Sequence, residues 1–158
     1  MEPSGLDGAE GEGGAGNVSG WAPDAPPYRV KAVIRRGGRY LLAVHNNRVP
    51  ENKGKWTFLG GLIDPPDPSP AAALVRELRE ELGVAGRVLG EVRRYAYQDD
   101  PGPCVILLAD FDGEPRPNEE LVALRWFTRE EVEAIGRAGL LHMGLELDAI
   151  TKAEQIDG

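Results

Sequence analysis

Three glutamates, Glu77, Glu80 and Glu81, lie within five consecutive positions of one predicted helix. At about 100° per residue, Glu77 and Glu81 stand one turn apart and Glu80 lies beside them. Leucines at four-residue spacing form the apolar side of the same helix, so the carboxylates lie at the rim of its buried face. Like charges at these spacings repel each other. The cluster therefore indicates that a positive group lies between the carboxylates.

Two interpretations explain such a cluster. In the first, Arg76 pairs with Glu80 four residues further on, and the helix simply carries a solvated charged face. In the second, the oxygen ligands hold a hard divalent cation, Mg²⁺ or Mn²⁺. The neighbouring sequence favours the second, because Gly60-Gly61 allows close backbone approach and a helix N-terminus attracts anions. Metal, backbone amides and helix end together suit a phosphate ester or anhydride.

The stretch GGLIDPPDPSPAAALVRELREELGV, residues 60–84, resembles the Nudix box, written Gx5Ex7REUxEExGU with U aliphatic. Its second half matches at every specified position, and five such identities arise by chance on the order of once in a million starting positions. In the first half, counting from Gly61 reaches Asp67 where the family has Glu. The segment from there to Arg76 is one residue too long. We place the extra residue within Pro65-Pro66.

The resemblance implies a metal-dependent hydrolase whose site consists mainly of carboxylates. Arg76 is expected to brace the carboxylates, since a guanidinium donates two parallel hydrogen bonds. Glu120, six residues ahead of Trp126, lies where the family often has a further carboxylate, although Glu119 and Glu120 are equally explained as a solvated turn. The implied catalytic residues are Arg76, Glu77, Glu80, Glu81 and Glu120, and the implied metal ligands are Gly60, Glu77, Glu80, Glu81 and Glu120.

The implied reaction is attack of water on phosphorus in a nucleoside diphosphate linked to another group, of the nucleoside triphosphate or nucleotide-sugar type. Basic residues of the first hairpin and its loop could contact phosphates, yet they equally protect a strand edge from aggregation. Aromatic residues in strands could stack a base, yet they more often belong to the core. The alternative function is a Nudix-fold ligand sensor with little or no turnover. The substrate-binding candidates are Arg35, Arg48, Lys55, Phe58 and Gly61.

The implied fold is an α/β class, Nudix-type α/β/α sandwich with a mixed β-sheet. Alternating apolar and polar residues predict a hairpin, and a second hairpin flanks the turn DDPGP. Ser69 and Gly83 predict the start and end of the glutamate-bearing helix. The predicted strands are 28–36, 39–45, 56–58, 87–97, 104–111 and 121–127, and the predicted helices are 70–82, one opening at Thr128, and approximately 141–155.

Composition limits the remaining choices. Residues 1–26 are rich in Gly, Pro and acids and are predicted to be a disordered tail, followed by one Nudix domain at 27–158. The net charge is −8, but outside the tail 18 basic residues face 21 acidic ones, so no basic surface for nucleic acid is expected. One cysteine, no signal-like stretch and no apolar run of membrane length favour a cytoplasmic protein. The sequence leaves oligomeric state open, a homodimer included.

Overall fold

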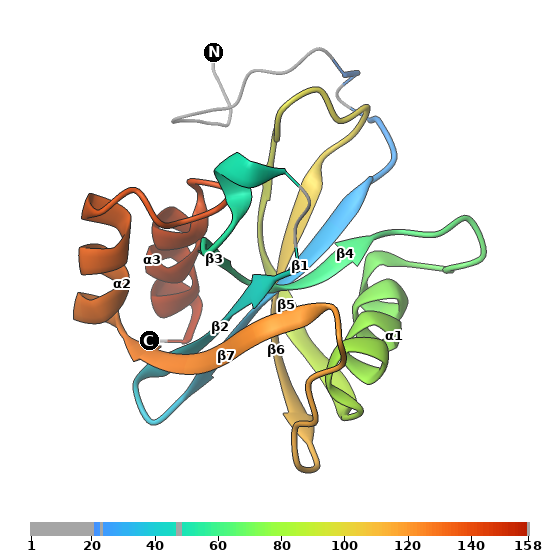
Figure 1. Ribbon diagram of the computed structural model, residues 1–158. Helices are drawn as coiled ribbons and strands as arrows, with labels where there is room; N and C mark the ends of the chain where they lie inside the picture. The colour runs from blue at the N-terminus through green and yellow to red at the C-terminus, as the bar shows by residue number, and fades with distance from the viewer. Residues whose placement is uncertain (1–20, 23, 47–48, 158) are drawn as a thin grey trace.

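The computed structural model describes residues 21–22, 24–46 and 49–157. A seven-stranded sheet with both parallel and antiparallel pairs lies between one helix on one side and two on the other (Figure 1). This confirms the predicted α/β fold. The strands are β1 (Arg29–Arg36), β2 (Arg39–His45), β3 (Trp56–Thr57), β4 (Leu59–Leu62), β5 (Ala85–Tyr95), β6 (Cys104–Asp112) and β7 (Leu121–Thr128), and the helices are α1 (Pro70–Leu82), α2 (Arg129–Arg137) and α3 (Glu146–Asp157).

The sequence predicts a disordered acidic tail and no apolar run of membrane length. Most of the predicted acidic tail, residues 1–26, lies outside the described residues. Among the helices of the described part, none combines the length and the apolar character needed to cross a membrane.

Strand β1 is the centre of the sheet. It pairs antiparallel with β2 and β4 and parallel with β6. Its alternating sequence does not leave a polar face in solvent: Lys31 is buried together with Val30, Ala32, Val33 and Ile34. The reason is that α1 and α3 both contact this strand, so both of its faces are covered.

Helix α1 has the predicted bounds. The Ser69 hydroxyl accepts a hydrogen bond from the Ala72 N–H, and Pro70 occupies the first turn, where its missing N–H costs nothing. Gly83 ends the helix in the left-handed conformation at φ 69°. The leucines of its apolar side are fully buried in a core that β1, β5 and β6 complete. These signals fix the direction in which the helix presents its glutamates.

The third helix begins at Glu146, five residues later than predicted. Residues 140–142 instead run beside β3 and exchange backbone hydrogen bonds with Trp56. Gly144 then turns the chain at φ 86°. The fully buried Glu146 carboxylate accepts hydrogen bonds from the N–H groups of Met143 and Gly144, both at 2.9 Å. This carboxylate holds the turn that starts α3.

We predict that Glu146→Ala lowers the unfolding free energy by about 2–4 kcal/mol, because two partly buried N–H groups lose a charged acceptor. Urea denaturation followed by circular dichroism would measure this. The matched control is Glu130→Ala on the exposed surface of α2, which should change stability by less than about 0.5 kcal/mol. Equal effects of the two substitutions would contradict the structural role of Glu146.

Candidate active site

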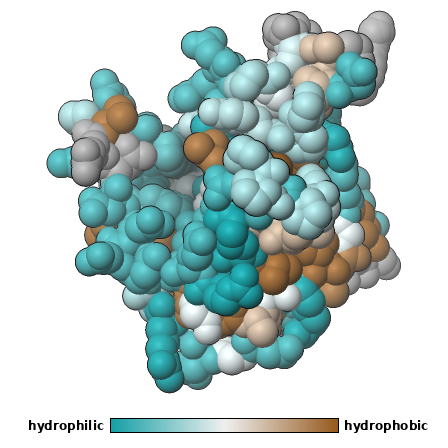
Figure 2. All heavy atoms as spheres, turned by 90° about the vertical axis from the view of Figure 1, so that its right-hand side faces the viewer, coloured by the Kyte–Doolittle hydropathy of each residue, from teal (hydrophilic) through white to brown (hydrophobic). Residues whose placement is uncertain are grey.

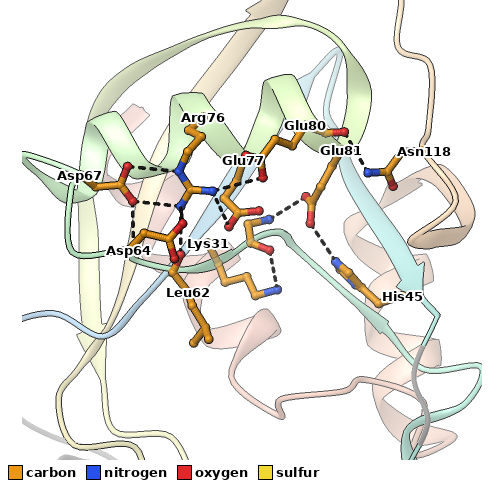
Figure 3. Close-up of polar contacts among 11 residues, drawn as sticks. Lys31, His45, Leu62, Asp64, Asp67, Arg76, Glu77, Glu80, Glu81 and Asn118 are labelled. Carbon is orange, nitrogen blue, oxygen red and sulfur yellow. Dashed lines mark hydrogen bonds and ion pairs between the residues drawn. The ribbon is translucent and has the colours of Figure 1, made fainter.

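Glu77 and Glu81 of α1 contact the Gly60-Gly61 segment of β4. Figure 3 shows the three glutamates of α1, with Glu80 paired to Arg76. Their exposure is graded. The Glu81 side chain is 3% exposed and that of Glu77 13%, whereas that of Glu80 is 54% exposed. The carboxylates thus run from the buried side of the helix to solvent. This is the arrangement that the helical spacing predicts, and it leaves Glu80 as the most accessible of the three.

The Gly60 peptide joins the helix to the centre of the sheet. Its N–H donates to Glu81 Oε1 at 3.1 Å, and its carbonyl accepts from Lys31 Nζ at 3.3 Å. Gly60 has φ 130°, and a Cβ there would lie 2.2 Å from the carbonyl oxygen of Val30. Only glycine allows β4 to approach β1 and α1 this closely.

Gly61 plays a similar part for the next glutamate. A Cβ on Gly61 would lie 2.7 Å from Glu77 Oε2, so the carboxylate rests directly against the backbone of β4. The predicted role of Gly61 in close backbone approach therefore has a geometric basis in this contact.

Arg76 braces the carboxylates from the loop side (Figure 3). Its Nε and Nη2 donate to the two Asp67 oxygens at 3.1 and 2.9 Å, and its Nη1 lies 3.4 Å from Glu77 and 3.1 Å from Glu80. Asp67, six residues after Gly61, therefore supplies the acid that pairs with Arg76. The placement of the extra loop residue within Pro65-Pro66 stays a prediction.

Burial and the neighbouring carboxylates change the protonation of Glu77. Burial and the neighbouring Glu81 raise the pKa of Glu77 to about 7, and Arg76 only partly offsets this. On the loop side, the Arg76 guanidinium lowers the pKa of Asp67 and is itself held in its charged form. A divalent cation near Glu77 would favour its ionised form and remove the repulsion.

The loop before β7 is tied to the end of α1. Asn118 donates its backbone N–H to the Glu81 carbonyl at 2.9 Å and its Nδ2 to the Glu80 carbonyl at 2.9 Å. Glu120 is exposed in this loop, and its carbonyl accepts from Asn46 N–H next to β2. The structure thus ties Asn118, two residues before Glu120, to the end of α1, whereas the Glu120 backbone contacts Asn46 and the Asn118 side chain.

The substrate-binding candidates do not all converge. Arg35 lies four residues beyond Lys31 on β1, with its guanidinium 6.0 Å from the Tyr40 ring, away from α1. The Phe58 ring is fully buried in the core on the α3 side, so Phe58 offers its backbone carbonyl and not a stacking surface. Lys55 is half-buried immediately before β3, and Arg48 lies outside the described residues.

Two residues of the site carried no motif signal. His45 Nε2 lies 3.5 Å from Glu81 Oε2, and Lys31 Nζ contacts the carbonyl groups of Phe58 and Gly60. Lys31 belongs to no motif, but a local pattern could have indicated its burial, because it is a charged residue within the otherwise apolar run V-K-A-V-I. The histidine could not be found by spacing, because β2 and α1 are distant in the sequence.

The donor set suits a hard divalent cation, because Glu77, Glu80 and Glu81 supply carboxylate oxygens and the Gly60 backbone supplies a carbonyl oxygen. Within the described residues, no group of three His, Cys, Asp or Glu side chains is arranged so that it could hold a metal ion as it stands. Instead Arg76 and Lys31 partly compensate the carboxylates. The residues present therefore fit a metal chemically, and Arg76 contacts only one oxygen each of Glu77 and Glu80.

Comparisons with known proteins agree with this site. The family model described as NUDIX domain matches residues 25–143, which include all the carboxylates of the candidate site. The chain belongs to the Nudix family. Among solved structures, the solution structure of the E. coli ORF135 protein is 33% identical with a TM-score of 0.55, and the match covers 71% of this chain and 81% of that chain. A crystal structure of a Nudix hydrolase from Nitrosomonas europaea reaches a TM-score of 0.68 at 18% identity, over 87% of this chain and 76% of that chain, and shows the fold alone.

Two curated relatives carry functional names. CTP pyrophosphohydrolase of Escherichia coli (strain K12) is 40% identical over 106 residues, which are 65% of this chain and 76% of that protein. RNA pyrophosphohydrolase of Acidiphilium cryptum (strain JF-5) is 36% identical over 107 residues, which are 65% of this chain and 60% of that protein. Together with the family match, these relatives identify this Nudix protein as a pyrophosphohydrolase.

The two glycines of this Nudix box should respond differently to alanine. In Gly61→Ala the new Cβ meets the end of the Glu77 side chain, so we expect Glu77 to move, with a small change in stability and a loss of Mg²⁺-induced thermal stabilisation. In Gly60→Ala the Cβ meets β1 backbone at positive φ, so we expect the fold to lose about 2–4 kcal/mol. Thermal melts with and without Mg²⁺ measure both effects, and the reverse ranking of stability would contradict this assignment.

In the metal-free protein, the contribution of Glu77 to stability should decrease as pH rises. Folding raises the pKa of Glu77 from 4.5 to about 7, so the folded state binds more protons between these values. The resulting stabilisation is fully present below about pH 4.5 and is lost as pH rises through about 7.

We expect the unfolding free energy in EDTA of the wild type, relative to that of Glu77→Gln, to fall by about 2 kcal/mol from about pH 5 to about pH 8, because the amide does not titrate. Burial lowers the pKa of His142 to about 4, so His142 makes both proteins more stable as pH rises and cancels in this difference. Urea denaturation at several pH values measures it, and an equally steep dependence in Glu77→Gln would refute the assignment to Glu77.

Proposed function

We propose that this Nudix pyrophosphohydrolase cleaves a phosphoanhydride bond of a nucleoside triphosphate and requires Mg²⁺ or Mn²⁺. The observation that carries the proposal is the carboxylate cluster of α1, in which Glu77 and Glu81 lie against the Gly60-Gly61 backbone and Glu80 pairs with the same Arg76 that contacts Glu77. The pKa of Glu77 is raised to about 7 there. Such a cluster is costly in isolation, and a hard divalent cation removes the cost.

Each residue has a proposed role in this reaction. Glu77, Glu80 and Glu81 would hold the metal together with the Gly60 carbonyl, and Glu120 is retained as a further carboxylate. When bound, a divalent cation neutralises charge on the phosphoryl oxygens and makes a coordinated water more acidic. Arg76 keeps the carboxylates in place through the hydrogen bonds that tie it to the loop and to the helix.

The choice of a nucleoside triphosphate rests on the relatives. The relative named CTP pyrophosphohydrolase matches over more of its own length than the relative named RNA pyrophosphohydrolase, 76% against 60%. The near balance of charge outside the acidic N-terminal segment also suits a small substrate better than a polynucleotide. We therefore propose a mononucleotide substrate, with CTP as the first compound to test.

The sensor alternative is less well supported, because all three carboxylates of the second half of the box are present.

A cytoplasmic location also remains our proposal. It is consistent with Cys104, a free and fully buried thiol whose pKa is raised to about 12 by burial, since such a thiol forms no structural disulfide here.

The test is ³¹P NMR of product formation from CTP, the other nucleoside triphosphates, ADP-ribose and a nucleotide sugar, with and without Mg²⁺. We expect Mg²⁺-dependent cleavage of a triphosphate, reduced by at least about 100-fold in Glu80→Gln. Glu80 is suited to this test because it is mostly exposed, so its substitution should leave the fold intact. The control Glu130→Gln removes an exposed glutamate on α2 and should retain activity. Binding without turnover would favour the sensor, and turnover that Glu80→Gln leaves unchanged would exclude this site.

A further inference from the structure

Lys31 is a buried lysine that the proposed reaction does not use. The residue is 7% exposed, and its Nζ donates to the carbonyl groups of Phe58 and Gly60, both at 3.3 Å. Burying an ammonium group costs several kcal/mol, on the order of 3 or more, unless its hydrogen bonds and charge are compensated. Packing alone therefore does not explain a buried lysine at the centre of the sheet.

The Gly60 peptide is held at both ends by groups of opposite charge. Glu81 accepts from its N–H at 3.1 Å, and Lys31 donates to its carbonyl at 3.3 Å (Figure 3). Glu77 and Glu81 also interact electrostatically with the ammonium. One peptide unit thus links the buried cation to the carboxylate cluster.

We propose that Lys31 is a positioning residue that holds the Gly60 carbonyl in the metal-free enzyme and opposes the divalent cation that shares this carbonyl. The inference rests on the metal site proposed above. With the usual Mg–O distance of about 2.1 Å and the 3.3 Å contact of Lys31, a cation on that oxygen would lie within about 6 Å of Nζ. Two positive charges at this separation repel strongly inside a protein.

The repulsion has a consequence for the order of binding. A divalent cation alone is repelled by Lys31 and binds weakly. A cation that binds together with a polyphosphate is accompanied by negative charge, which offsets the positive charges of the cation and of Lys31. Metal and substrate should therefore strengthen each other's binding, as reciprocal linkage requires. Lys31 would in this way keep the cation bound mainly when a substrate is present.

The experiment is titration of the full-length protein with Mn²⁺, with free Mn²⁺ followed by electron paramagnetic resonance in the absence of nucleotide. We expect Lys31→Met to bind Mn²⁺ at least about 10-fold more tightly than the wild type, because methionine fills a similar volume without the charge. Lys31→Gln keeps a donor for the carbonyl but removes the charge, so it should also bind more tightly. If Lys31→Met does not fold, the Mn²⁺ affinity of Lys31→Gln tests the proposal instead.

The matched control is Lys152→Met, which removes the same charge from α3, where Lys152 lies 3.8 Å from Asp148. Its Mn²⁺ affinity should equal that of the wild type. Unchanged or weaker binding in the folded Lys31 variants overturns the proposal.

Glu81→Gln separates the two proposals. If wild-type Mn²⁺ binding depends on Glu81 but not on Lys31, only the role of Lys31 is wrong. If Mn²⁺ binding is absent in the Lys31 variants as well as in the wild type, or is indifferent to Glu81→Gln, the metal site is wrong and the role of Lys31 is wrong with it.

Discussion

The contact between the α1 carboxylates and the backbone of β4 is the constraint on which the rest of the site depends. Glu77 rests on Gly61, and Glu81 accepts from the Gly60 N–H. A side chain at either glycine would enter space that the site needs, so the two elements meet only because this segment has none. The proline-rich loop, the cap at Ser69 and the buried leucine face all serve to bring α1 to this contact. Figure 2 looks onto this side of the molecule, where hydrophilic and hydrophobic surface lie next to each other.

Charge compensation explains why the fold tolerates the cluster. Arg76 neutralises the carboxylates from the loop side and Lys31 from within the sheet, yet the pKa of Glu77 is still raised to about 7. Part of the repulsion therefore remains in the folded protein. Sites that bind a charged ligand often retain such unfavourable energy, because the ligand then removes it and binds more tightly.

The elements predicted correctly from the sequence are those whose ends and pairing depend on residues close together in the chain. The bounds of α1 followed from Ser69 and Gly83, and the first hairpin followed from its alternating apolar and polar residues. The features missed from the sequence depend on tertiary contacts. Lys31 was interpreted as a polar position of an alternating strand, but helices on both sides of the sheet bury it. The start of α3 was predicted too early, because the segment before it pairs with Trp56 across the chain.

The acidic residue in the loop of the box, Asp67, shows what the motif requires physically. Aspartate is one methylene shorter than glutamate, yet Asp67 forms a bidentate pair with Arg76. The Asp64 N–H donates to Asp67 Oδ2 at 2.8 Å, which fixes the carboxylate within its turn. The prolines on both sides of Asp67 reduce the conformational entropy that the longer loop would otherwise lose on folding. The requirement is thus an acid placed against the guanidinium, and different spacings can satisfy it when the loop compensates.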